Sequence, residues 1–376
     1  MKTIRRIRVL HIIQSLNYGG MERVLADLVS RCDPEKFEQH VLCLGYLGRF
    51  SQGLDEIAQL HVAESTEPLS MLHPRRLTKQ IARIGPDVVH THSGVWYKAS
   101  LAARRARVRW LIHTEHGRRQ PDSWHHRLVD GIAARRTDVV VGVSERLAQD
   151  LPATLRISPA RVECILNGID TDAFRPKPDG GALRRELDIS GHGPIVGSIG
   201  RLEPIKAYEV MIEAFALFTK TTVGQNATLV IAGAGSARAS IVQAIEDNGL
   251  TSRVHLLGWR DDVQNLHSSF AVFTMSSKSE GTSISLLEAM SAGIPPVVTD
   301  VGGNRAVLGP ALSSYLVPSG DPAALAAAWA SVLATPETHA HASQLARTRV
   351  VDAFGLGAMA GAYERLYERG PPVIGR

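Results

Sequence analysis

The stretch Ser276–Ala292, SSKSEGTSISLLEAMSA, continues as GIPPVVTDVGGN to Asn304 and decides how the whole chain is interpreted. Its pattern predicts a strand, a loop, a helix, a second loop and a second strand. Glu280 lies in the first loop, and Glu288 lies in the helix. The residues that lead from the loop into the helix are Gly281, Thr282, Ser283 and Ile284.

The start of this helix is suited to a phosphate group. Thr282 or Ser283 can cap the helix, and the unsatisfied N–H groups of its first turn, at the positive end of its dipole, favour an anion. Within one ideal helix, the eight residues from Glu280 to Glu288 rise about 12 Å, more than the ~5–9.5 Å between the carboxyls of a hydrolytic acid–base pair. Since Glu280 precedes the helix, the distance can be shorter. The spacing favours two contacts on an extended ligand, and the alternative is a capping Glu280 with a solvated Glu288.

Short apolar runs alternate with helical patterns along all 376 residues, which predicts parallel sheets covered on both faces. The expected strands are Arg8–Ile13, His40–Leu44, Asp87–Thr91, Trp110–His113, Asp138–Val143, Val162–Leu166, Ile195–Ile199, Thr228–Ala232, Val254–Leu257, Ala271–Thr274 and Pro296–Thr299. Pro and Gly residues cluster between Phe174 and Asp188, so we expect a boundary there. The predicted fold is α/β, with two doubly wound, Rossmann-like domains, 1–178 and 179–355, facing a cleft.

Composition narrows the class of protein. A hydrophobic content of 44% with 21% charged residues is typical of a soluble globular chain. The apolar run Val9–Ile13 is shorter than the ~7–15 residues of a signal peptide. Cys32, Cys43 and Cys164 have no metal-ligand spacing, so we expect reduced packing residues in a cytoplasmic protein.

Charge is distributed unevenly. Residues 1–175 carry 26 basic and 19 acidic residues, a net charge of +7, whereas the remainder carries 16 basic and 18 acidic residues, a net charge of −2. A basic first half favours an anionic partner such as a membrane leaflet, a lipid pyrophosphate or nucleic acid. The alternative is a solvated face with no partner.

Several loops at strand ends are candidate phosphate contacts. In Gly200–Lys206, GRLEPIK, the cations Arg201 and Lys206 could hold a pyrophosphate and stabilise the charge on a departing nucleotide diphosphate, although surface Arg and Lys are ordinary. Gly20 closes a glycine pair after the first strand and allows close backbone approach by a ligand. Gly233 and Gly235 are interpreted as turn residues, and the chain has no G-x-x-x-x-G-K-[ST] phosphate loop.

Histidines gather at the ends of strands in the first domain. The patterns at His90, His92, His113 and His116 suggest a metal, but no Cys joins them and no His-Glu-x-x-His helix is present. We therefore expect no metal site, and we expect two or three of these rings to be structural, hydrogen-bonded to backbone. His116 precedes Gly117 at a strand end, where a neutral imidazole could bind a sugar hydroxyl or move a proton.

Taken together, the segments resemble the retaining glycosyltransferases of family 4, which have the GT-B architecture. The matching pieces are Gly19-Gly20, DVVHTHS at Asp87–Ser93, HTEHG at His113–Gly117, NGIDTDAFRP at Asn167–Pro176, GRLEPIK at Gly200–Lys206 and EGTSISLLEAMSAGIPPVVTDVGGN at Glu280–Asn304. The resemblance spans nearly the whole chain. It implies that residues 356–376 form a helix crossing back to the first domain.

The resemblance also implies roles for individual residues. His116 and Glu280 are implied to contact the donor sugar near the reacting centre, with Gly281 beside them, and Glu288 to hold the ribose. The implied phosphate-binding residues are Arg201, Lys206, Gly20, Thr282, Ser283 and Ile284. Trp259 and Arg260 fall where the nucleotide base is contacted. The family usually has Lys-Gly where Lys206-Ala207 stands here, which alters the turn but keeps the charge.

These features predict a glycosyltransferase without cofactor or metal, moving sugar with retention from a UDP- or GDP-sugar. The acceptor is expected to be lipid-linked or a polysaccharide, as in bacterial exopolysaccharide and lipopolysaccharide pathways. The expected location is the cytoplasm, with peripheral attachment to the inner face of the membrane through the basic domain, and no nucleic acid is expected as partner. The alternatives are a non-catalytic two-domain sugar-nucleotide-binding protein and a GT-B-type epimerase.

Overall fold

The structure is a computed structural model that describes residues 5–17, 19–64, 71, 73–117 and 124–370. It divides into two compact units. The first runs to Gly168 and takes up the chain again from Leu356, and the second is Ile169–Gly355. Residues 169–178, expected in the first domain, therefore belong to the second unit, and the terminal helix belongs to the first.

The first unit is built on a seven-stranded parallel sheet of order β3-β2-β1-β4-β5-β6-β7. Its strands are β1 Ile7–Ser15, β2 Phe37–Tyr46, β3 Gln59–Val62, β4 Val88–His92, β5 Trp110–Glu115, β6 Val139–Gly142 and β7 Val162–Cys164. The order reverses direction between β1 and β4, which is the switch point of a doubly wound fold.

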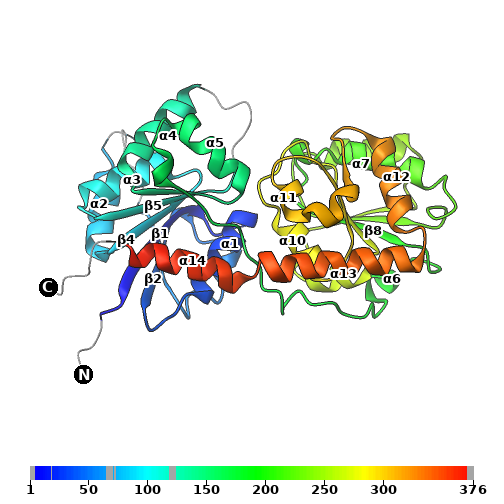
Figure 1. Cartoon of the computed structure of the whole chain (residues 1–376), viewed down its shortest axis with the longest axis horizontal. Helices are drawn as coiled ribbons and strands as arrows, with labels where there is room; N and C mark the ends of the chain where they lie inside the picture. Colours follow the sequence, from blue (N-terminus) through cyan, green and yellow to red (C-terminus); the bar gives the residue numbers. More distant parts are fainter. Residues whose placement is uncertain (1–4, 18, 65–70, 72, 118–123, 371–376) are drawn as a thin grey trace. The chain divides into compact units, whose positions relative to one another are not determined.

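Helices cover both faces of this sheet (Figure 1). They are α1 Gly20–Arg31, α2 Arg75–Ile84, α3 Trp96–Arg105, α4 Trp124–Arg136, α5 Glu145–Leu155 and α14 Leu356–Glu368. Helices α2 and α3 pack on the face that carries Leu10 and Ile12 of β1. Helices α1 and α14 lie on the opposite face, toward which His11 points, because side chains alternate along a strand.

The second unit holds a six-stranded parallel sheet of order β10-β9-β8-β11-β12-β13. Its strands are β8 Ile195–Ile199, β9 Thr228–Ala232, β10 Val254–Gly258, β11 Val272–Met275, β12 Pro296–Thr299 and β13 Leu316–Val317. Here the switch point lies between β8 and β11, and their carboxyl ends carry the loops at Gly200–Lys206 and Ser276–Ser283.

The helices of the second unit are α6 Ala182–Glu186, α7 Tyr208–Phe218, α8 Arg238–Asp247, α9 Val263–Ser269, α10 Ile284–Ser291, α11 Asn304–Leu308, α12 Pro322–Val332 and α13 Pro336–Ala353. Figure 1 shows α7 and α12 on one side of the sheet and α6 and α13 on the other. The core between sheet and helices is centred on Phe215, Phe218 and Trp329, which are fully buried. Each phenylalanine ring meets the Trp329 ring in a T-shaped arrangement, edge to face.

Two strands and one cysteine differ from the expectations. Strands β3 and β13 were not expected, since β3 is short and half-exposed and β13 has only two residues. Cys32 and Cys43 are buried, but Cys164 is exposed, so its predicted packing role is wrong. None of the described helices is long and apolar enough to cross a membrane.

Candidate functional site

The second unit brings two of the predicted loops together at its switch point. Lys206, at the end of the loop after β8, and Glu280, in the loop after β11, form an ion pair in which Lys206 Nζ lies 2.5 Å from Glu280 Oε1. The side chains are 18% and 9% exposed. The loops also share backbone contacts, because Lys278 N donates to the carbonyl of Ile205 at 2.8 Å. The sequence analysis predicted Lys206 and Glu280 in one site, but it did not predict their direct contact.

The Glu280 carboxylate is held by Ser277 as well as by Lys206. Ser277 Oγ donates to the same Oε1 at 2.5 Å. Thr299 Oγ1, at the end of β12, donates to the carbonyl of Ser277 at 2.8 Å. Gly302 has φ +54°, and a Cβ there would lie 1.8 Å from the carbonyl oxygen of Glu280. The glycines after β12 are therefore required for the backbone that carries Glu280.

A second pair of glycines supports the loop that carries Arg201. A Cβ at Gly233 would lie 1.9 Å from the carbonyl oxygen of Gly200, and one at Gly235 would lie 2.3 Å from that of Leu202. Leu202 N in turn donates to the carbonyl of Ala234 at 3.0 Å. Gly233 and Gly235 thus permit backbone-on-backbone packing against the loop after β8.

The start of α10 has the geometry of a capped helix. Ser283 is the N-cap residue, and its Oγ accepts a hydrogen bond from Leu286 N at 3.4 Å. Of the two capping candidates, the structure therefore selects Ser283. Thr282 and Ile284 flank it and are also buried. Since α10 begins at Ile284, Gly281 and Glu280 lie outside the helix, where they precede its positive end.

Glu288 lies in the middle of α10 and is buried, which excludes the solvated-face alternative. His267 on α9 is its neighbour, with Nε2 4.0 Å from Glu288 Oε2. Both ring nitrogens of His267 are buried without a hydrogen-bond partner among the described residues. The sequence missed His267, because a lone histidine in a helical pattern carries no signal for a buried carboxylate.

The other predicted site residues of the second unit differ in the contacts that their side chains make. Within the described part of the chain, the exposed Arg201 side chain makes no hydrogen bond or ion pair. Arg260, in contrast, pairs with Glu186 and Asp262, whose carboxylates hold the pKa of Arg260 above its usual value. Trp259 is 40% exposed, so its ring is accessible beside that cluster.

In the first unit, the carboxyl ends of β1 and β5 carry the other predicted residues, Gly20 and His116. Gly20 is the exposed first residue of α1, directly after the N-cap Gly19. His116 follows β5; its backbone N donates to Ser93 Oγ at 3.1 Å, and its Nε2 lies 3.1 Å from His92 Nδ1. Burial lowers the pKa of His116 to about 4, so the ring is neutral at pH 7.

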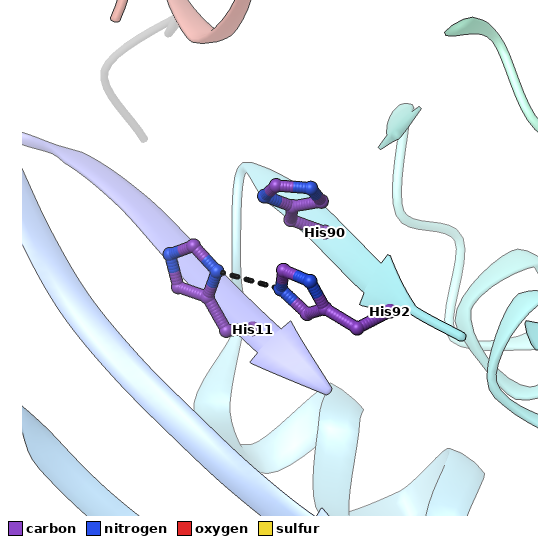
Figure 2. A group of neighbouring side chains, drawn as sticks. All are labelled: His11, His90 and His92. Carbon is purple, nitrogen blue, oxygen red and sulfur yellow. Dashed lines mark hydrogen bonds between the residues drawn. The ribbon is translucent and has the colours of Figure 1, made fainter. Parts of the chain in front are cut away.

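His92, which contacts His116, belongs to a buried cluster with His11 and His90. Figure 2 shows the three rings of the cluster. Their nearest ligand atoms lie within 4.8 Å of one another, a spacing compatible with a metal ion. All of these nitrogens already have hydrogen-bond partners, however. His90, for example, contacts Tyr367 Oη at 2.9 Å and Thr114 Oγ1 at 2.7 Å. The cluster is thus a hydrogen-bonded network, and His11 was missed because it lies in an apolar strand pattern.

Comparison with known proteins extends this description. The model of the family described as "Glycosyltransferase Family 4" matches residues 18–173, and that described as "Glycosyl transferases group 1" matches residues 181–349. The chain is 25% identical over 333 residues to the UDP-Gal:alpha-D-GlcNAc-diphosphoundecaprenol alpha-1,3-galactosyltransferase of Escherichia coli, covering 85% of this chain and 86% of that one. It is 27% identical over 396 residues to the 2-deoxystreptamine N-acetyl-D-glucosaminyltransferase of Streptomyces fradiae, covering 95% and 92%.

Solved structures show the same architecture. The HepE protein of Anabaena, in complex with UDP and glucose, superposes with a TM-score of 0.84 at 21% identity, over 96% of this chain and all of that one. WaaG, a glycosyltransferase involved in lipopolysaccharide biosynthesis, superposes with a TM-score of 0.74 at 16% identity, over 96% and 100%. Two parallel-sheet α/β domains of this kind define the GT-B class of glycosyltransferases. The chain belongs to glycosyltransferase family 4.

Proposed function

We propose that the chain transfers a sugar from a UDP- or GDP-sugar to a lipid-linked or polysaccharide acceptor, with retention of anomeric configuration and without a metal ion. The observation that carries the proposal is the Lys206–Glu280 pair beside the capped start of α10. A cation, a carboxylate and a helix N-terminus converge there at the carboxyl ends of the two switch-point strands, where open α/β folds bind ligands.

Each side chain has a role that follows from its chemistry. Lys206 has three N–H donors, so it can keep Glu280 and still bind a phosphate oxygen. Arg201 would add a planar guanidinium to the pyrophosphate, and the Thr282–Ile284 backbone would add N–H groups. These groups would stabilise the negative charge that grows on the departing nucleoside diphosphate, the work that a metal ion does in other transferases.

The carboxylates would hold the hydroxyl groups of the donor. Glu280, with Gly281, would accept hydrogen bonds from the sugar, and buried Glu288 from the ribose. Trp259 and Arg260 would lie by the base, with the Arg260 guanidinium kept in place by Glu186 and Asp262. We assign His116 to the donor sugar and Gly20 to the phosphates by resemblance to the family, with the leaving phosphate taking the proton of the acceptor.

The names of similar proteins support the substrate classes. The E. coli relative is described as acting on UDP-Gal and a diphosphoundecaprenol-linked sugar, and HepE was solved with UDP and glucose. The basic first half of the chain, with its net charge of +7, supports an acceptor or a membrane surface that is anionic. We place the enzyme at the cytoplasmic face of the membrane on the same ground.

The test is release of nucleoside diphosphate from UDP-, GDP- and ADP-sugars by the wild-type chain, by Glu280→Ala and by the control Glu203→Ala. Glu203 is an acid on the neighbouring loop whose Oε2 accepts from Ser236 Oγ. We expect turnover with one donor, lost only in Glu280→Ala. Tight nucleotide binding without release would favour the non-catalytic alternative, and a changed donor sugar without release would favour the epimerase.

Three further measurements test retention, metal independence and membrane binding. The anomeric proton of the product, observed by NMR, should show the configuration of the donor; inversion would refute retention. Activity should survive EDTA, whereas its loss and recovery with added divalent cation would refute metal independence. Binding to vesicles of anionic lipid should weaken in high salt, because exposed charges are screened.

A further inference from the structure

A single file of side chains connects His116 to the interior of the first unit. Gln39 Oε1, on β2, lies 3.1 Å from His11 Nε2, on β1. His11 Nδ1 lies 3.3 Å from His92 Nε2, on β4, the contact drawn in Figure 2. His92 Nδ1 lies 3.1 Å from His116 Nε2. We call these four residues the imidazole chain.

Burial keeps the rings of the imidazole chain uncharged. It lowers the pKa of His11 and of His116 to about 4 and that of His92 well below its usual value. Nearby Glu115 opposes this effect at His116, but desolvation outweighs it. Each ring therefore carries one proton at pH 7, on either Nδ1 or Nε2.

Each contact between two rings holds one proton, so the three rings must adopt the same tautomer. A nitrogen that faces another nitrogen must donate if its partner accepts, so the choice at His11 sets that at His92, and His92 sets that at His116. Gln39 presents its amide oxygen, which only accepts. His11 must then carry its proton on Nε2, and so must His92 and His116.

The last atom of the imidazole chain is left as a bare acceptor. With its proton on Nε2, His116 has a lone pair on Nδ1, and that nitrogen is buried without a hydrogen-bond partner among the described residues. A lone pair repels a phosphate oxygen and accepts from a hydroxyl or N–H group. The amide of Gln39 cannot take up a proton. The imidazole chain therefore ends at Gln39 and does not conduct protons.

We propose that Gln39, His11 and His92 are positioning residues that fix His116 as a neutral hydrogen-bond acceptor at Nδ1, selecting a hydroxyl-bearing group over an anion. The identification of this group as a hydroxyl of the donor sugar rests on the proposed function. The His116 tautomer does not depend on that function.

The competing use of the same rings is a metal site. It requires His11, His90 and His92 to give up hydrogen bonds, including those of His90 to Tyr367 and Thr114. The imidazole chain needs no such rearrangement. The two uses differ in a measurable way, because a bound cation replaces protons on the ring nitrogens.

The experiment is 15N NMR of the full-length chain labelled on histidine, with the His116 signals identified by their loss in His116→Gln. We expect protonated Nε2 and bare Nδ1 at pH 7. Gln39→Glu keeps an acceptor and should keep this tautomer. Gln39→Leu removes the acceptor and should give a mixture of both tautomers. His61→Gln is the matched control, since it breaks the separate His40–His61 contact, of 3.1 Å, in the same sheet; His116 should not respond.

Three results would overturn the proposal: a proton on His116 Nδ1 in the wild-type chain, an unchanged His116 tautomer in folded Gln39→Leu, or stoichiometric binding of added Zn²⁺ with shifts at His11 and His92. The kinetic arm uses the best donor. Gln39→Leu should lower kcat/KM about tenfold through the lost hydrogen bond, and Gln39→Glu should restore it. If no donor is turned over, the proposed function fails while the NMR result still stands.

Discussion

Lys206 and Glu280 come from loops 74 residues apart and meet with Nζ 2.5 Å from Oε1, while Ser277 Oγ occupies the same carboxylate oxygen. Both charged side chains are largely buried. In such a setting the attraction between the charges offsets their desolvation, and removing one partner leaves the other uncompensated. The pair therefore ties the shape of the site to the presence of both charges.

The first prediction follows from this coupling. Lys206→Met should lower the free energy of unfolding by about 1–3 kcal/mol, because Glu280 loses its cation. The double variant Lys206→Met/Glu280→Gln should recover most of that loss. Urea unfolding of the two single variants and the double variant measures the coupling, and additive losses would show that the pair contributes nothing.

Ala207, directly after Lys206, has a left-handed backbone with φ 49° and ψ 46°. Where the family usually has glycine, alanine here bears a conformational cost of about 1–2 kcal/mol, offset by its buried methyl group. Ala207→Gly should therefore leave stability within about 1 kcal/mol of the wild type. Ala214→Gly is the matched control, buried inside α7, and should cost more, because glycine disfavours a helix. Equal melting-temperature losses would contradict the strain at Ala207.

Gly302 supports the Glu280 backbone, so Gly302→Ala should lower both stability and donor turnover. The added Cβ would lie 1.8 Å from the Glu280 carbonyl oxygen and force that loop to move. Gly320 also has a positive φ, of +80°, but a Cβ there meets no atom of the described residues within 4 Å. Gly320→Ala thus carries the backbone strain without the clash. Thermal unfolding and nucleotide-release rates should both rank Gly302→Ala below Gly320→Ala; the reverse order would refute the role of Gly302.

The buried histidines predict loss of stability in acid. Burial lowers the pKa of His11 from 6.5 to about 4, so the unfolded chain binds more protons than the native one between these values. This contribution is complete above pH 6.5 and is lost as pH falls toward 4. It is on the order of 3 kcal/mol for His11. Unfolding of the wild type and His11→Gln at a series of pH values should give a shallower dependence in the variant. Parallel curves would show that His11 does not contribute.

His267 buries two ring nitrogens that have no hydrogen-bond partner in the described part of the chain. Replacing it by leucine removes that unsatisfied polarity, so His267→Leu should keep or raise the free energy of unfolding. His339 is the control, since its Nε2 lies 2.8 Å from the Ala271 carbonyl oxygen, and His339→Leu should lose about 1 kcal/mol. Calorimetric titration with nucleoside diphosphate then asks whether affinity falls without His267 beside Glu288. A large stability loss in His267→Leu would point to a partner that the ring holds.

The local sequence pattern was enough to predict most strands of the two sheets and the elements around Glu280. Strands Thr228–Ala232 and Pro296–Thr299 have the predicted bounds, because each is a continuous apolar run between turn residues. The edge strand β3 alternates the polar residues Gln59 and His61 with Leu60 and Val62 and has no such run. The division between units, at Gly168, was also displaced, since Pro and Gly mark a turn without saying which core it joins.

The parts of the site that sequence could not provide are contacts across strands. Gln39, His11 and His92 come from three different strands and form one file only when β2, β1 and β4 lie in that order. In the same way, the roles of Ser277 and Gly302 follow only from their contacts with Glu280. Ser277 bonds to its carboxylate, and Gly302 lies against its carbonyl oxygen. Such relations depend on register and sheet order, which no local pattern encodes.

The first unit is closed by the final helix of the described chain. Tyr363 and Tyr367 of α14 are fully buried and bond to Thr114 and His90 in the sheet. A ribosome makes residues 1–168 long before it makes this helix, and domains generally fold as units. Until the second unit has been synthesised, the amino-terminal part therefore lacks the α14 cover of the sheet face that α14 shares with α1, and Thr114 and His90 lack their tyrosine partners. In this protein the part that is made first is finished last.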